Sequence, residues 1–440
     1  MTRNDASCVH VVHCVDTEGP LHESLEATFE RLRDAFGVTL APSRATLKQI
    51  QRRELDPNGW EEAAARMVAP AQLAYLDTWE KIDRSLDMVF SPQFRDPLRD
   101  SFGNPYVCNW FCMDHVGFEA NPRRRAFGYH VVFEHYRTRL NSAPHTGDDI
   151  YFHYHPVPIS RQANHRATAC FANSDTLYQI LARRVIDHGW FPCANRPGFN
   201  ATRPDSHWFL EQHIPFDFAN QAMHAADRSQ ADRATGRFVD WRRAPVGWTP
   251  YHPDKDDYQK PGECRRWIAR CLDQAEIDRA FSQAARGEPV ILAYADHDHR
   301  TIPPDMEHAH AMLLDAAARH PGVPFQYCTA RDAFRRAMNL SEEDGVTFGC
   351  RWQGPVLHVK ADAPTFGPQP FLALKRTDGA YFTDNMDCDT PHREWSYTFD
   401  AETIPLKDVS RVGLAACSPG GSVTVTVINP ADGSVEQNRI

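Results

Sequence analysis

The fold of the chain is set by residues 9–20, which read VHVVHCVDTEGP. The run Val9–Val15 is rich in β-branched residues, and this predicts a buried strand. Asp16 and Glu18 follow the run, and Gly19-Pro20 ends the strand. Ligands of α/β proteins bind beyond the carboxyl ends of the strands. The two carboxylates are therefore candidates for chemistry. The alternative is a strand end whose acids face solvent or cap the next helix.

The composition is that of a globular protein with a core, since 42% of the 440 residues are hydrophobic and 24% are charged. A net charge of -10 argues against a nucleic-acid partner, which usually binds a basic face. The 12 cysteines are scattered and form no CxxC pair. No stretch approaches the ~20 apolar residues of a membrane span, and no leader pattern opens the chain. We therefore expect a cytoplasmic protein with reduced thiols and no membrane span.

Polar clusters also follow later predicted strands. These strands are Tyr106–Met113, which precedes Asp114 and His115, and Pro289–Ala295, which precedes Asp296, His297 and Asp298. The run 149–156 reads DIYFHYHP, and alternation along a strand places Tyr151, His153 and His155 on one face. Two imidazoles at that spacing can converge on one metal ion, and the alternative is a polar strand edge.

The alternation of strands and helices from residue 8 to about 340 predicts parallel β/α units. Candidate residues lie at the ends of five strands, the four above and a fifth within Trp190–Asn200 that runs into the loop of Arg196, and this favours a barrel over an open sheet. Residues 21–105 are expected to form a helical insertion, and Arg123–Leu140 a further helix. After residue 340 the chain turns to short strands separated by Gly, Pro, Asn and Asp, which predicts an antiparallel β-sandwich. The predicted domains are therefore 1–340 and 341–440.

In their order along the chain, these motifs resemble those of the polysaccharide deacetylases of the NodB-homology type, carbohydrate esterase family 4. The matching segments are Asp16-Thr17-Glu18, His153-Tyr154-His155-Pro156, Arg196-Pro197-Gly198, Asp240-Trp241 and Leu292–Asp298. The resemblance covers roughly residues 8–340 and implies the family's distorted (β/α)7 barrel. It is nearest to proteins of bacterial surface-polysaccharide gene clusters, such as those for lipopolysaccharide biosynthesis.

The resemblance implies a metal-dependent hydrolase that removes an N-acyl group, with acetyl the first expectation, from a sugar of a surface glycan or its precursor. Its metal ligands are expected to be Glu18, His153 and His155, and imidazole ligands favour Zn²⁺ over Mg²⁺ or Ca²⁺. Asp16 is expected to be the general base and His297 the general acid.

Other residues are expected around this centre. Arg196 is expected beside Asp240, and a carboxylate of Asp240 or Asp298 is expected to raise the pKa of His297. Trp241 and Trp248 are candidates for a platform under the sugar ring. The remaining substrate-side candidates are Asp114, His115 and Asp298.

Two departures from the family pattern leave alternatives open. Thr17 separates the two acids, and Tyr151 stands where the family has the first histidine of its second motif. Either His153 replaces that ligand, or the metal site is altered or lost. The alternatives are a catalytically weak or inactive glycan-binding protein and a hydrolase of a non-sugar amide or formamide. The sequence does not predict the oligomeric state.

Overall fold

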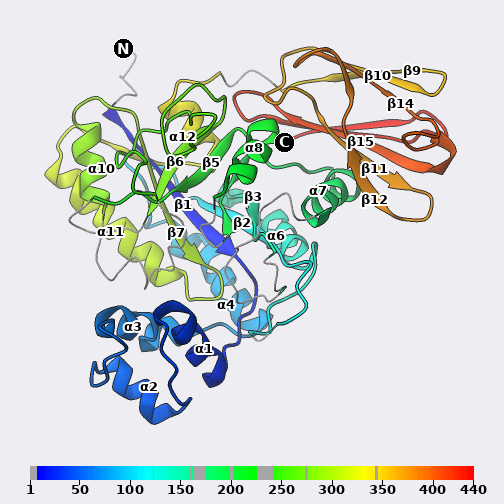
Figure 1. Ribbon diagram of the computed structural model, residues 1–440. Coiled ribbons are helices and arrows are strands. Elements are labelled where there is room, and N and C mark those ends of the chain that lie inside the picture. The colour runs from blue at the N-terminus through cyan, green and yellow to red at the C-terminus, as the bar shows by residue number, and fades with distance from the viewer. Residues whose placement is uncertain are drawn as a thin grey trace.

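The computed structural model describes residues 7–121, 123–157, 161, 175–198, 202–224, 241–272, 276–341 and 345–440 (Figure 1). The architecture is a parallel barrel followed by antiparallel sheets, as the sequence predicts. None of the helices in these residues is long and apolar enough to cross a lipid bilayer.

Seven parallel strands close the barrel. They are β1 (Val9–Thr17), β2 (Cys108–Asp114), β3 (Asp149–Tyr154), β4 (Ala194–Asn195), β5 (Phe216–Asn220), β6 (Trp267–Leu272) and β7 (Val290–His297). Strand β1 closes the ring because it pairs with β7 along its length and with β2 over His13–Thr17. The short strand β8 (Phe325–Tyr327) pairs with the first residues of β1, outside the ring. All carboxyl ends therefore meet at one end of the barrel.

Helices surround the barrel. They are α6 (Val131–Asn141), α7 (Asp175–His188), α8 (Pro204–His213), α10 (Ile277–Ala284), α11 (Pro303–Arg319) and α12 (Ala330–Ala337). Strand β1 is buried on both faces, since Val12 and Cys14 join one apolar cluster while Val11 and Val15 join another. This explains its near-continuous apolar run.

Two details differ from the sequence predictions. Strand β6 was not predicted, because Arg270 interrupts its apolar run; the guanidinium is buried and bonded to Glu276 and to the carbonyl of Ala222. The helix predicted to begin at Arg123 begins instead at Val131, after a loop in which Gly128 has a φ of 133°.

The helical insertion comprises α1 (Leu25–Phe36), α2 (Arg44–Gln51), α3 (Glu61–Met67), the 3-10 turn η2 (Pro70–Leu73), α4 (Trp79–Phe90) and the short α5 (Pro92–Arg95). Helix α1 begins at the side-chain cap of Ser24 and ends at Gly37, whose φ is 70°. In Figure 1 helices α1–α3 lie at the end of the barrel toward which β1 and β7 point.

Two antiparallel sheets make up the C-terminal sandwich. One contains β13 (Asp387–Thr390), β14 (Glu394–Thr398), β10 (Val356–Ala361) and β9 (Phe348–Gln353), in that order. The other contains β12 (Tyr381–Asp384), β11 (Phe371–Arg376), β15 (Val409–Cys417), β16 (Val423–Ile428) and β17 (Val435–Arg439). Their shared core includes Leu357, Trp395 and Leu414. The domain boundary at residue 340 stays a prediction.

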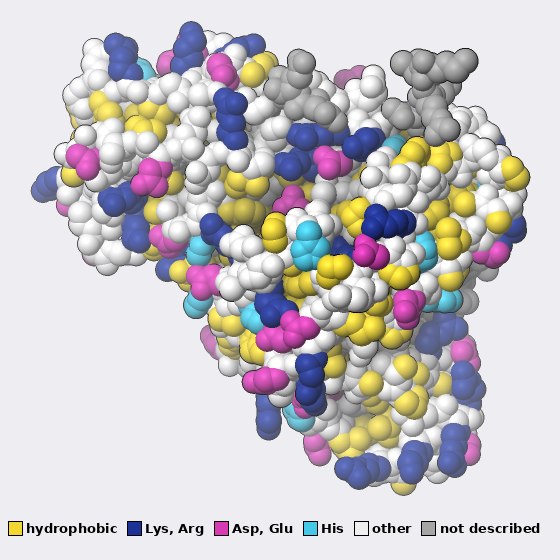
Figure 2. Space-filling view, turned by 180° about the vertical axis from the view of Figure 1, so that it is seen from behind, with side chains coloured by type: hydrophobic (Ala, Val, Ile, Leu, Met, Phe, Trp, Pro, Cys, Tyr) yellow, Lys and Arg dark blue, Asp and Glu magenta, His cyan; other side chains and the backbone are white. Residues whose placement is uncertain are grey.

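The space-filling view in Figure 2 shows the sandwich and the helical insertion at opposite corners of the molecule. Acidic and basic side chains are interspersed over the face that this view presents.

Candidate metal centre

A cluster of buried metal-binding side chains lies at the carboxyl ends of β1 and β3. Glu18 follows β1, while His153 belongs to β3 and His155 comes just after it. One potential ligand atom of each residue lies within 4.8 Å of those of the other two. Glu18 Oε1 is 3.7 Å from His155 Nε2, and the Nε2 atoms of the two histidines are 3.0 Å apart. The three residues that the sequence predicts as ligands are therefore together.

The donor set fits a divalent metal ion. His153 Nδ1 donates to the carbonyl oxygen of Arg196 at 2.8 Å, and this contact leaves Nε2 as the acceptor nitrogen facing His155. Two nitrogens held about 2.0–2.1 Å from a tetrahedral Zn²⁺ lie about 3.3 Å apart, close to the separation observed here. Burial lowers the pKa of both imidazoles well below the usual value, so both are neutral and able to bind metal.

The loop after β4 packs tightly over this centre. Gly198 lies so close to the histidine strand that a Cβ atom there would come within 2.2 Å of the His155 ring and 2.5 Å of the Tyr154 carbonyl. The glycine of the Arg196-Pro197-Gly198 motif is therefore needed for close approach.

Asp16 is held beside the centre by Arg196. The Arg196 Nη1 atom donates to Asp16 Oδ2 at 2.6 Å, and Asp16 Oδ1 lies 3.7 Å from His153 Nδ1. Burial raises the pKa of Asp16 to about 7, although the guanidinium of Arg196 opposes the shift. The sequence motifs predict Arg196 beside Asp240. The structure pairs it with Asp16 instead, and Asp240 lies outside the described residues.

His297, at the end of β7, faces the same centre. Its Nε2 atom lies 3.7 Å from Asp16 Oδ2 and 3.9 Å from Glu18 Oε1, and about a third of its side chain is exposed. Burial, together with the charges of Arg300 and Arg196, lowers the pKa of His297 well below its usual value. This direction is opposite to the rise that the sequence predicts for the pKa of His297, and Asp240, one of the two carboxylates expected to cause that rise, lies outside the described residues.

Asp298 binds the backbone at the end of β1. Its Oδ1 and Oδ2 atoms accept hydrogen bonds of 2.8 Å from the backbone N–H groups of Glu18 and Gly19. The hydroxyl of Tyr136 adds a third at 3.0 Å. Asp298 is thus fully engaged with the loop that carries Glu18, and the prediction that it contacts substrate or holds His297 is corrected.

Asp114 and His115 are buried at the end of β2. Asp114 pairs with Arg184 of α7, which is also buried, so the carboxylate supports the barrel wall and does not face a substrate. The His115 ring centroid is 5.8 Å from that of His155, and burial lowers the pKa of His115 to about 3. His115 therefore packs behind the metal centre as a neutral ring.

The two tryptophans predicted as a sugar platform are buried. Trp248 is 1% exposed, and its carbonyl accepts a hydrogen bond from the N–H of Ile291 in β7. Ile291 comes six residues before His297, which is about 20 Å along an extended strand. Trp248 belongs to the core at the opposite end of β7, and its predicted role is wrong for that reason. Trp241 is 4% exposed and packs against Tyr251 and Ile268, so it presents no open ring face either.

The basic residues around the centre were not predicted from the sequence. Arg125 is buried, and its Nη1 atom contacts Glu18 Oε2. Arg123, from the same loop, pairs with Glu23 at 2.7 Å, and Arg300 follows His297 in the turn after β7. The run Arg123-Arg124-Arg125 is the signal in the sequence that points to this basic group.

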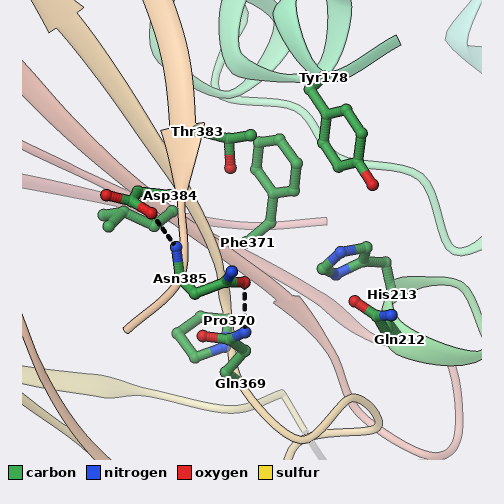
Figure 3. Close-up of a pocket in the computed structure, with 10 residues that line it drawn as sticks. Tyr178, Gln212, His213, Gln369, Pro370, Phe371, Thr383, Asp384 and Asn385 are labelled. Carbon is green, nitrogen blue, oxygen red and sulfur yellow. Dashed lines mark hydrogen bonds between the residues drawn. The ribbon is translucent and has the colours of Figure 1, made fainter. Parts of the chain in front are cut away.

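A cavity lies between the barrel and the sandwich (Figure 3). It has a volume of about 200 Å³ and is lined from α7, α8, β11 and β12 by residues that include Tyr178, His213, Gln369, Phe371 and Asp384. Burial lowers the pKa of His213 to about 4, and Asp384 Oδ2 accepts from the hydroxyl of Tyr397 at 2.8 Å. The described polar groups that line it form no pair suited to catalysis.

No family model matches the chain, and no curated protein is significantly similar to it. Among solved structures, the chain is similar to an endo-beta-1,4-mannanase double mutant from Cellulomonas fimi. The identity is 12%, the alignment covers 76% of this chain and 86% of that chain, and the TM-score is 0.21. A similarity this weak carries no argument about activity, so membership of the NodB type stays a prediction.

Proposed function

We propose that the protein is a metal-dependent hydrolase that removes an N-acyl group from a sugar. The observation that carries the proposal is the buried set of Glu18, His153 and His155, with the Asp16–Arg196 pair directly beside it. The sequence motifs of the deacetylase type support the choice of an amide of a sugar as the substrate.

The chemistry is divided between an ion and the protein. A divalent metal, with Zn²⁺ favoured by the two imidazoles, would supply a Lewis acid that polarises the acyl carbonyl. Asp16 is suited to accept the proton of the attacking water, because its pKa of about 7 allows it to be ionised and still basic near neutral pH. Arg196 orients this carboxylate through its hydrogen bond to Oδ2.

His297 is placed to deliver a proton to the leaving nitrogen. Because burial lowers the pKa of its imidazole, the proton has to come from within the site, and Asp16 Oδ2 lies 3.7 Å from Nε2. The proposal is that Asp16 takes the proton from water and passes it to His297, which protonates the amine. Asp298 keeps Glu18 in position by holding the backbone of the β1 loop.

The test is metal content followed by a substrate screen. Protein purified without chelators is expected to hold about one divalent ion, and His153→Ala should weaken binding about a hundredfold or more, since even outer residues of metal sites account for 10–100-fold. His358→Ala, in strand β10 of the sandwich, is the matched control and should leave metal content unchanged. Release of acetate or formate from acylated amino sugars, but not from ureides, would support the sugar amide.

A second candidate, a glycan-binding protein without hydrolytic activity, is supported by the contact of Arg125 with Glu18. A guanidinium on the carboxylate competes with a metal ion for the same oxygen atoms. Under this candidate the purified protein holds no metal, and Arg125→Ala creates metal binding that the natural chain lacks. Under the hydrolase proposal, metal binds to the natural chain and Arg125→Ala changes affinity only severalfold.

A further inference from the structure

The rim of the metal centre carries an excess of positive charge where the helical insertion meets the turn after β7. The carboxylate of Glu23 is buried and is shared by Arg31, at 2.9 Å, and Arg123, at 2.7 Å. Arg300 stands beside this group and has no carboxylate within ion-pair distance among the described residues. Three guanidinium groups are thus balanced by one carboxylate.

The arginines of this cluster pack around the ring of Tyr75. The guanidinium carbons of Arg123 and Arg300 lie 5.3 and 5.8 Å from the ring centroid of Tyr75, which follows η2 in the insertion. The Tyr75 hydroxyl donates to Glu23 Oε2 at 3.1 Å, and His299 packs against the same ring at 5.6 Å between centroids. The backbone joins these elements as well, because the N–H of Leu76 donates to the carbonyl of His299 at 2.8 Å.

Hydrogen-bonding capacity also remains in the cluster. The buried Nε atoms of Arg123 and Arg300 have no acceptor among the described residues. Besides its interaction with Tyr75, the Arg300 guanidinium makes a long 3.4 Å contact to the Gln72 carbonyl. Arg300 is only partly buried and lies three residues after His297. Like charges at this density are costly unless an anion joins them.

We infer that Arg300, supported by Arg123 and Tyr75, binds an anionic group carried by the sugar substrate, a carboxylate or a phosphate. The inference rests on the proposed function for the presence of a sugar at the centre, and it adds the substrate class. Guanidinium groups suit both anions because their paired N–H donors match carboxylate and phosphate oxygens. The helical insertion then selects the substrate, since it supplies Tyr75, Glu23 and Arg31.

Binding to full-length, metal-free protein measured by calorimetry tests the inference without requiring hydrolysis. The probes are N-acetylglucosamine as the neutral sugar, N-acetylmuramic acid for a carboxylate, N-acetylglucosamine 6-phosphate for a phosphate, and inorganic phosphate alone. At least one acidic sugar should bind at least tenfold more tightly than the neutral sugar. Arg300→Gln should remove this preference, a loss of about tenfold to a hundredfold for a charged hydrogen bond.

The controls separate charge from folding. Arg52→Gln removes one positive charge from an exposed position of the same insertion and should change affinity less than twofold. Arg300→Lys should keep most of the preference, and melting temperatures show which variants are folded.

Equal affinity for neutral and acidic sugars in the natural protein overturns the inference. So does an equal loss for all sugars in Arg300→Gln, or binding of inorganic phosphate as tight as that of the sugar phosphate. Failure of the hydrolase proposal would appear separately, as metal-loaded protein that releases no acyl group while the binding preference persists.

Discussion

The helical insertion and the C-terminal sandwich are both additions to the barrel, but they meet it in different places. The insertion contacts the loops after β1 and β7, where Trp79 packs 3.1 Å from the position of a Cβ on Gly19 and Leu76 bonds to His299. The sandwich packs on the outer side of α7, where Gly413 of β15 approaches Val185 and Tyr381 bonds to Asp187. A change in the insertion can therefore reach the metal centre directly, whereas a change in the sandwich acts through overall stability.

The largest expected effects lie in the centre that the insertion borders. Asp16→Asn and His297→Ala should each lower turnover about 10²–10⁴-fold on an identified substrate, the usual scale for general acid–base groups. Metal should stay bound in His297→Ala. Trp352→Ala, in β9 of the sandwich, is the control and should lower stability without lowering turnover per folded molecule. Near-normal turnover in either site variant would refute the assigned roles.

The same substitution, Gly→Ala, can be made at a glycine in each of the two contacts. Gly19→Ala places an L-residue at a φ of 72° beside Trp79, and Gly413→Ala places a Cβ 2.6 Å from Val185 Cγ1. Each should lower the free energy of unfolding by about 1–3 kcal/mol, through backbone strain in the first and overpacking in the second.

The affinity for metal should differ between the two glycine variants. It should fall about tenfold in Gly19→Ala, because Glu18 is the adjacent residue, and should be unchanged in Gly413→Ala. Denaturant unfolding and metal titration measure both quantities. Equal metal affinities in the two variants would remove the distinction between the additions.

A pH dependence is expected at His115, which is buried just after β2. Its pKa is about 3 in the folded protein and about 6.5 when unfolded, so the unfolded state binds more protons between these values. Stability from this group is therefore lost as pH falls below 6.5. Relative to His115→Phe, the natural protein should lose about 1.4 kcal/mol per pH unit between pH 6 and 5. A constant difference over this range would contradict burial of a neutral imidazole.

The smallest expected effects on stability come from removing a single hydroxyl group in the insertion or in the sandwich. Tyr75→Phe removes a bond to Glu23, and Tyr381→Phe removes bonds to Asp187. Each should cost about 1 kcal/mol of unfolding free energy in thermal or denaturant unfolding. Only Tyr75→Phe should also alter the binding of acidic sugars, and the reverse result would place the recognition in the sandwich.

Much of the fold could be predicted from the sequence because its signals are local. The apolar run of β1 and its polar end, the Ser24 and Gly37 caps of α1, and the change to short strands after residue 340 all appear in neighbouring residues. Strand β6 could not be predicted in this way, because the burial of Arg270 depends on Glu276 and on the carbonyl of Ala222 from another part of the chain.

The sequence by itself predicted that Glu18, His153 and His155 come together, through the alternation that puts both imidazoles on one face of a strand and through the resemblance to the deacetylases. Only the tertiary structure decided what each neighbouring polar residue does. Asp16, Asp114 and Asp298 all follow apolar runs in the same way, yet one pairs with Arg196, one with Arg184 and one with backbone N–H groups. The partner of Asp16 is 180 residues away and that of Asp114 is 70. The role of a buried carboxylate depends on the donor that reaches it, and that donor is brought by packing between distant segments, which no local pattern encodes.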